Sequence, residues 1–205
     1  MVKDGYRFAL LPLILGIVLL AFRWWWATVF VVLGLFVLYF FRDPERQLPR
    51  DPDVVVSPAD GRVVEIVDEQ IGARAGKRIS IFLSIFDVHV NRAPVAGRIS
   101  RLEYKPGRFM AAWKGKASAE NEQNLVALQT PRGEMTFKQI AGWVARRIVF
   151  WKRQGDEVLL GERVGMIRFG SRVDVWLPQG AEILVRRGQK VSGGSTVLGR
   201  WPSTK

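Results

Sequence analysis

The 205-residue chain contains no cysteine and only one histidine, His89. The lack of cysteine excludes a disulfide framework, a cysteine-ligated metal centre and a thiol nucleophile. A single histidine excludes metal sites built on two or three imidazoles, and it leaves one side chain of the kind that titrates near neutral pH. We therefore expect no bound metal, and we expect any proton transfer near neutral pH to involve His89.

Charge is also scarce at the start of the chain. Between residues 8 and 41 the only charged residue is Arg23, which separates apolar runs at residues 8–22 and 24–41. A helix that spans a bilayer takes about 20 apolar residues, with a range of roughly 17–25. The second run qualifies alone, whereas the first is short and contains Pro12. No small-residue cleavage site follows the apolar run, so we reject a secretory signal.

Two membrane arrangements fit these runs. One is a helical hairpin with tryptophans 24–26 at the far interface, and the other is a single span with an interfacial first segment. In a hairpin, Lys3 and Arg7 lie on the same side as Arg42, so the positive-inside rule places the rest of the protein in the cytoplasm. A buried core hairpin is disfavoured because it would leave no solvent face. We predict membrane-associated helices in residues 1–41, at the cell membrane, with the rest of the chain, residues 51–205, on its cytoplasmic face.

The composition changes after a charged linker at residues 42–50. Short Val- and Ile-rich runs are separated by Gly and Pro, and none shows a long 3.6-residue period. We therefore expect residues 51–205 to form a mainly β domain, a sandwich or a barrel. The runs of strand length are 62–67, 78–85, 98–104, 125–130, 134–140, 164–169, 173–177 and 182–185.

Two weak internal repeats occur in this part. Residues 58–63 (PADGRV) and 94–99 (PVAGRI) share one form, and residues 155–165 and 188–199 share G-[DQ]-x-V-x-x-G. The second pair resembles the turn-and-strand units of biotinyl and lipoyl carrier domains, although no lysine occupies a carrier-type tip. We expect biotinyl-like hairpin units without a carrier function. The glycines are equally explained as ordinary turn residues.

Three residue types needed for chemistry at a serine occur in separate segments. His89 lies near the exit of an apolar strand, and Asp60 stands in a turn where its carboxylate could orient an imidazole. Gly170 and Ser171 lie between two strand-like runs, where they could form a hairpin turn or a bulge. A hydroxyl, a base and an orienting group are what nucleophilic chemistry at serine requires. Each of the four residues also has an ordinary structural explanation.

The segment from residue 106 to residue 124 has no strand pattern and looks like a long loop, which is often functional. It carries Phe109 and Trp113 beside Lys114 and other cations. We expect these residues to meet the membrane interface, with apolar groups inserted and cations near lipid phosphates. An ordinary surface flap is the alternative. The net charge of +12 fits an anionic lipid surface, and no nucleic-acid-binding motif is present, so we expect no nucleic-acid partner.

Five segments in the same order resemble phosphatidylserine decarboxylases of the short, membrane-associated type: SPADGRV, FDVHVNRAPVAGRI, ENEQN, IAGWVARRI and GMIRFGSRVDVWLP. Two positions depart from the family pattern. Arg172 stands where long bacterial members have Thr, as in the short forms, and Gln123 stands where the family often has Arg.

The resemblance implies a pyruvoyl-dependent enzyme that is made as a proenzyme and cleaves itself between Gly170 and Ser171. The products would be a β chain of residues 1–170 and an α chain of residues 171–205. They would form a heterodimer that could assemble further. The covalent pyruvoyl group, derived from Ser171, would be the cofactor. The substrate would be phosphatidylserine in the membrane, converted to phosphatidylethanolamine.

The resemblance also implies the roles of the site residues. Ser171 would become the group that forms a Schiff base with the substrate amine. His89 would act as the base in cleavage and as the proton donor in turnover, with Asp60 orienting it. The alternative is a non-enzymatic, membrane-anchored β-domain adaptor, in which the Gly-Ser pair is only a turn.

Overall fold

A computed structural model describes residues 2–22, 25–71, 74–107, 121–142, 147–168 and 171–202. The chain divides into two compact units, residues 1–45 and residues 46–205. We describe each unit by itself.

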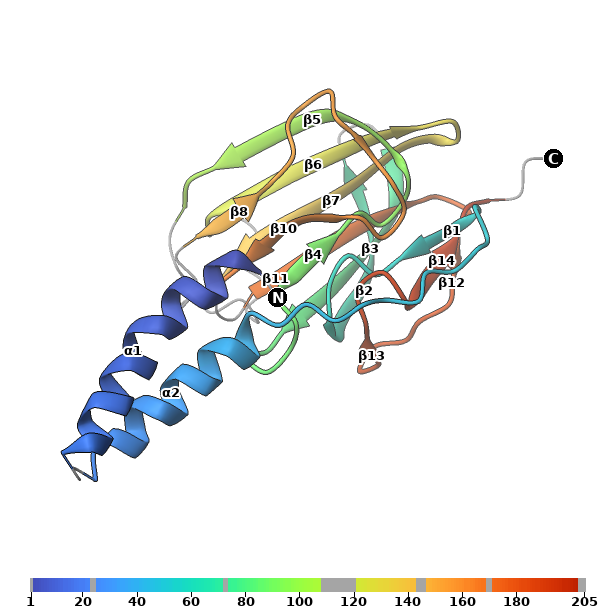
Figure 1. Cartoon of the computed structure of the whole chain (residues 1–205). Coiled ribbons are helices and arrows are strands. Elements are labelled where there is room, and N and C mark those ends of the chain that lie inside the picture. The colour runs from blue at the N-terminus through green and yellow to red at the C-terminus, as the bar shows by residue number, and fades with distance from the viewer. Residues whose placement is uncertain are drawn as a thin grey trace. The chain divides into compact units, whose positions relative to one another are not determined.

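The first unit is a pair of antiparallel helices, α1 (Lys3–Ala21) and α2 (Ala27–Phe40) (Figure 1). The backbone N–H of Val2 donates to the carbonyl of Phe41 at 3.1 Å, which joins the start of α1 to the end of α2. The helices approach closely at Gly34, where an added Cβ would lie 2.5 Å from Cγ of Leu13. The apolar segment is therefore a helical hairpin, one of the two arrangements expected.

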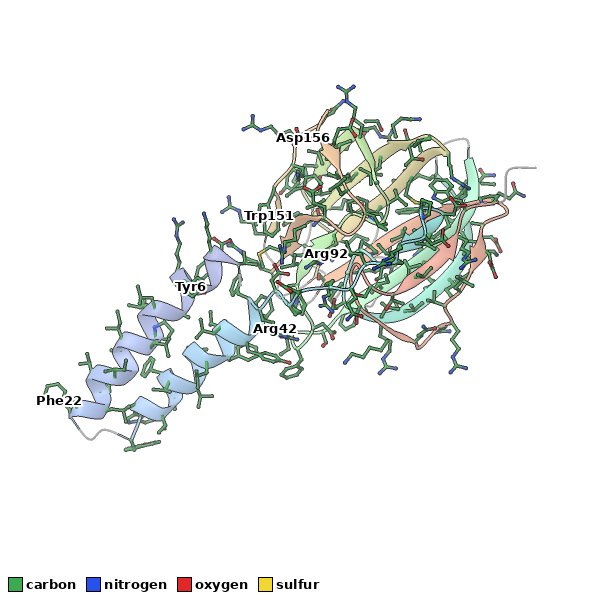
Figure 2. All side chains as sticks on the ribbon, turned by 45° about the vertical axis from the view of Figure 1, so that its right-hand side comes forward. Tyr6, Phe22, Arg42, Arg92, Trp151 and Asp156 are labelled. Carbon is green, nitrogen blue, oxygen red and sulfur yellow. The ribbon has the colours of Figure 1, made fainter. Side chains whose placement is uncertain are left out.

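The lengths of the two helices differ from the expectation. With a rise of about 1.5 Å per residue, the 19 residues of α1 span about 28 Å and the 14 residues of α2 about 21 Å. Only α1, among the described helices, is long and apolar enough to cross a membrane. The second apolar run was expected to be the longer span, but the first helix is the longer one. The reason is that α1 extends back to Lys3, whereas α2 begins only at Ala27. Exposed side chains such as Tyr6 and Phe22 project from α1 (Figure 2), and this apolar helix suggests membrane association.

The second unit is mainly β, as predicted, and each of the eight predicted runs overlaps a strand. The pairings are antiparallel, and the largest sheet has eight strands (Figure 1). Their order is β13 (Lys190–Val191), β2 (Gly61–Ile71), β3 (Arg74–Leu83), β11 (Ser171–Pro178), β7 (Gly133–Ala141), β6 (Gln123–Thr130), β5 (Gly97–Lys105) and β9 (Glu157–Val158).

Two three-stranded sheets complete the unit. One contains β1 (Val54–Val56), β14 (Val197–Arg200) and β12 (Glu182–Ile183), and the other contains β4 (Val90–Arg92), β10 (Arg163–Ile167) and β8 (Ile148–Phe150).

The core lies on one face of the eight-stranded sheet, which we call the inner face. Successive side chains of a strand point to opposite faces. On β11, Val173, Val175 and Leu177 are therefore in the core, and Ser171 precedes them on the same face. The other, outer face of β11 carries Arg172, Asp174 and Trp176.

The predicted repeats are two copies of one substructure. In one copy the backbone N–H of Arg92 donates to the carbonyl of Pro58 at 2.8 Å, and in the other Val56 donates to Pro94 at 2.9 Å. The later repeats match in the same way, because Gly188 donates to Val63 at 2.7 Å and Gly155 donates to Ile99 at 2.8 Å.

The ladders β1–β14 and β4–β10 also correspond. Each contains a β-bulge, which falls opposite residues 55 and 56 in the first ladder and opposite residues 91 and 92 in the second. Val55 pairs with Gly199 in the first ladder, and Asn91 pairs with Gly165 in the second. Asn91 therefore occupies the position that Val55 holds in the other copy.

Candidate active site

Ser171 is the first residue of β11, a central strand. It pairs with Leu83 at the end of β3 and with Ala141 at the end of β7. Ser171 is fully buried, and its Oγ has no hydrogen-bond partner among the described residues. The strands β10 and β11 belong to different sheets, so they do not pair as the two arms of a hairpin. Gly170 lies outside the described residues.

His89 is fully buried just before β4. Its Nδ1 lies 2.9 Å from the backbone carbonyl of Asp87. Because a carbonyl oxygen only accepts, this contact places the imidazole proton on Nδ1 and leaves the Nε2 lone pair as the basic site. The turn before His89 is held by the carboxylate of Asp87, which accepts from the backbone N–H and the hydroxyl of Ser84, both at 2.8 Å. The structure therefore selects the tautomer that a general base requires.

Short stretches of chain connect Ser171 with His89. The backbone N–H of Ile167 donates to the carbonyl of His89 at 3.4 Å. Ser171 is four residues further along the chain, and four residues span at most about 14 Å. Leu83, the ladder partner of Ser171, precedes His89 by only six residues. Arg92, labelled in Figure 2, ends the strand that follows His89 and donates to the carbonyl of Gly161 at 3.0 Å.

Asp60 lies in other surroundings. Both of its carboxylate oxygens accept from Nη2 of Arg46 at 2.9 Å, and Oδ1 also accepts from the backbone N–H of Gly193 at 2.8 Å. His89 is not among the partners of Asp60 within the described residues. The contact that fixes the tautomer comes instead from the backbone of Asp87, which the sequence analysis did not single out. A carbonyl carries no side-chain signature, so only the conformation reveals it.

The segment at residues 120–124, ENEQN, had no assigned role beyond the resemblance, and the structure supplies one. Asn121 Nδ2 donates to the carbonyl of Ala141 at 2.7 Å, and the backbone N–H of Ala141 donates to the carbonyl of Glu122 at 2.9 Å. Oε1 of Glu122 accepts from the backbone N–H of Ile148 at 3.2 Å. These bonds hold the end of β7 in place directly opposite Ser171.

Arg172, one of the departures from the long bacterial members, belongs to a buried ion cluster on the outer face. Its guanidinium donates to Asp174 at 2.6 Å and to the hydroxyl of Ser80 at 2.7 Å. Arg78 contacts Glu65 at 2.8 Å and Asp174 at 3.7 Å. Arg172 and Asp174 are only 2% and 1% exposed, so the cluster fixes the backbone that follows Ser171.

Burial and charge set the pKa values of two cations in this cluster. Burial lowers the pKa of Lys138, and the nearby carboxylate of Asp174 only partly opposes this effect. Burial also acts to lower the pKa of Arg78, but hydrogen bonds to Glu69 and Glu65 and the charge of Asp174 outweigh it, so that the pKa is raised.

The residues expected at the membrane interface, Phe109, Trp113 and Lys114, lie outside the described residues. The structure describes the two ends of this segment. β5 extends to Lys105 and β6 begins at Gln123, so the last residues of the predicted loop are part of a strand.

The β domain thus offers a buried serine hydroxyl with no hydrogen-bond partner among the described residues and a buried histidine whose Nδ1 contacts a backbone carbonyl. Comparison with known proteins shows which family contains this domain. The sequence model of the phosphatidylserine decarboxylase family matches residues 33–199. The chain therefore belongs to the phosphatidylserine decarboxylase family and is a decarboxylase.

Two curated relatives agree with this assignment. The phosphatidylserine decarboxylase proenzyme of Symbiobacterium thermophilum is 47% identical over 205 aligned residues, which cover 98% of this chain and 95% of the relative. The phosphatidylserine decarboxylase proenzyme of Solibacter usitatus is 52% identical over 174 residues, which cover 85% and 83% of the two chains.

Proposed function

We propose that this chain is a proenzyme that cleaves itself between Gly170 and Ser171. It then decarboxylates phosphatidylserine to phosphatidylethanolamine with a pyruvoyl group derived from Ser171. The observation that carries the proposal is the buried Oγ of Ser171, which has no hydrogen-bond partner among the described residues. It is supported by the bond from the backbone N–H of Ile167, four residues before Ser171, to the carbonyl of His89.

In maturation, His89 removes the hydroxyl proton of Ser171 through Nε2, because Nδ1 is committed to the carbonyl of Asp87. Oγ then attacks the carbonyl carbon of Gly170. An O–C bond forms, the peptide C–N bond breaks, and the proton ends on the released amine of Ser171. Elimination across Cα and Cβ separates the β chain as a carboxylate and leaves a dehydroalanine. This enamine tautomerises to an imine, and water hydrolyses the imine to the pyruvoyl ketone with release of ammonia.

The surroundings of Ser171 fit a pyruvoyl group. A buried hydroxyl without a partner is unfavourable, but maturation removes this hydroxyl. The pairing of β11 with β3 and β7 begins at residue 171 itself. This pairing can therefore hold the new chain end after the cut, and it supports a heterodimer of the two chains. When formed, the group supplies a carbonyl that withdraws the electrons left by the departing carbon dioxide.

In turnover, His89 is the proposed donor of the proton that replaces carbon dioxide on the substrate. Its burial excludes water from that proton. We keep Asp60 as the proposed residue that orients His89. In the uncleaved chain its carboxylate accepts from Arg46 and from the backbone N–H of Gly193. We place the helical hairpin in the cell membrane and the β domain on the cytoplasmic side, so that a lipid substrate can reach the site from the bilayer.

The deciding experiment is the intact mass of the purified protein under denaturing conditions, beside Ser171→Ala. The proposal expects two chains divided after Gly170, with the smaller one lighter than encoded by the difference between serine and pyruvoyl. It expects Ser171→Ala to stay whole. A single full-length mass for both proteins, together with no decarboxylation of phosphatidylserine in vesicles, would reject the proposal and favour the adaptor.

A further inference from the structure

Three buried amide side chains form a row in which the amide nitrogen of Asn91 has no acceptor among the described residues. Asn124 Nδ2 donates to Gln139 Oε1 at 3.0 Å, and Gln139 Nε2 donates to Asn91 Oδ1 at 2.8 Å. The three residues are 3%, 0% and 0% exposed. Asn91 Nδ2 is left buried without an acceptor among the described residues. A buried donor without a partner destabilises a protein, so this atom calls for an explanation.

The row lies on the inner face, toward Ser171. Gln139 is the ladder partner of Val173, which shares its face of β11 with Ser171 two residues earlier. Asn91 lies in β4, and His89 directly precedes this strand. The bond from the N–H of Ile167 to the carbonyl of His89 continues the β4–β10 pairing by one residue, so strand alternation puts the side chains of His89 and Asn91 on the same side. The amide nitrogen of Asn91, the imidazole and the serine hydroxyl therefore belong to the same side of the sheet.

The internal duplication provides an independent argument. Asn91 pairs with Gly165, whereas the corresponding residue of the other copy, Val55, pairs with Gly199. Val55 is fully buried and belongs to the apolar core. The fold therefore accepts an apolar side chain at this position. The copy that follows His89 instead carries the polar Asn91, whose Nδ2 has no acceptor among the described residues, and this favours a chemical role over a packing role.

We propose that Asn91 Nδ2 donates the hydrogen bond that stabilises the negative oxygen formed during self-cleavage. This inference rests on the proposed function. When Ser171 Oγ attacks the preceding carbonyl, the carbon–oxygen double bond becomes a single bond and its oxygen becomes an anion. As the C–N bond breaks, an electron pair of this oxygen re-forms the double bond, and the leaving nitrogen takes the proton that His89 removed from the hydroxyl. This oxygen lies about 2.3 Å from the nitrogen of Ser171, because both atoms are bonded to the attacked carbon.

The neighbouring amides act as positioning residues. Because Gln139 Nε2 occupies Oδ1 of Asn91, the amide of Asn91 cannot rotate to present its oxygen without losing that bond. Asn124 fixes the orientation of Gln139 in the same way. The row therefore presents a donor, rather than an acceptor, to the site before the negative charge forms, which is the arrangement that stabilises an oxyanion.

The test follows cleavage of the full-length chain during cell-free translation with lipid vesicles, read by intact mass. Asn91→Val removes the donor and introduces the residue of the other copy. Gln139→Glu keeps the size but offers only acceptors, so that the amide of Asn91 turns its Nδ2 away from the site. Loss of one oxyanion donor slows a reaction by about 10²–10³-fold, and we expect that retardation of cleavage in both variants.

Gln123→Glu is the matched control. Gln123 is a buried amide on the same strand as Asn124, its side chain points to the other face, and it pairs with Ile140. This variant adds the same charge as Gln139→Glu and is expected to cleave at the wild-type rate. Thermal unfolding beside Ser171→Ala checks that the uncleaved variants are folded.

Hydroxylamine, which cleaves esters, locates the affected step. If Asn91 acts in the attack, the uncleaved Asn91→Val chain contains no ester and hydroxylamine leaves it whole. Cleavage of folded Asn91→Val or Gln139→Glu within tenfold of the wild-type rate would overturn the inference and leave the proposed function intact. Accumulation of an ester in Asn91→Val would also overturn the inference, because it would show that the attack still occurs without Asn91. A wild-type chain that never cleaves would instead reject the proposed function, and this inference with it.

Discussion

The buried ion cluster around Arg172 allows a prediction with a definite magnitude. Replacing Arg172 by Met removes contacts to Asp174 at 2.6 Å and to Ser80 at 2.7 Å. Asp174, which is 1% exposed, then retains Arg78 at 3.7 Å as its ion-pair partner among the described residues. Removal of one partner of a buried pair costs about 3–5 kcal/mol, because the other charge is left without compensation. Since Arg78 remains, we expect Arg172→Met to lower the free energy of unfolding by about 3 kcal/mol.

The assay is thermal unfolding of the full chain in detergent, with Ser171→Ala in every protein so that the chain stays in one piece. For proteins of this size a loss of 1 kcal/mol lowers the melting temperature by about 2–4 °C. Arg172→Met should therefore lower it by roughly 6–12 °C. The double variant Arg172→Met/Asp174→Leu removes both charges and should recover part of the loss. A single variant within about 2 °C of its parent, or a double variant less stable than the single one, would refute the reasoning.

Three further predictions test the site, the cluster and the membrane hairpin. His89→Gln should slow self-cleavage by about 10²–10⁴-fold, seen by intact mass, and wild-type cleavage would exclude His89 as the base. Burial lowers the pKa of Lys138 below its ordinary value of 10.5. Between the lowered pKa and 10.5 the unfolded chain therefore binds more protons than the folded one, so the free energy of unfolding of the wild type should rise with pH over this range. Lys138→Met should remove this rise in melting curves between pH 7 and about 10, and an unchanged slope would contradict it. Cysteines introduced singly at Lys3 and Arg42 of this cysteine-free chain should both react with an impermeant thiol reagent from the cytoplasmic side, whereas labelling from opposite sides would exclude the hairpin.

Much of the fold could be predicted from the sequence because its signals are local. Alternating apolar residues between turn residues identified strands such as β3, β7 and β11. Two long apolar runs identified the helical segment at the start of the chain but left a hairpin and a single span open. The repeated glycines anticipated the duplication, since corresponding turns close with the same backbone hydrogen bonds at Gly155 and Gly188. The helix lengths were less predictable, because the capping and turn residues at the ends of α1 and α2 give weak signals.

The site shows the same division between local and distant information. Ser171 and His89 could be singled out from motifs, from the lack of any other histidine and from the family resemblance. The partner that fixes the tautomer of His89 is a backbone carbonyl, and Asp60 meets Arg46 rather than His89 within the described residues. Neither contact has a pattern in the sequence, because each depends on how turns and a linker fold back on the domain.

By itself the sequence determined the apolar N-terminal segment, the β domain and the residue types available for chemistry, because composition and short-range periodicity carry that information. Only the tertiary structure decided which of those residues meet. It joined Asn91 to Gln139 across 48 positions of the chain and buried Arg172 beside Asp174 on the outer face of the sheet. Strand register and sheet order create such neighbours, and both are set by packing of the whole domain rather than by any local segment.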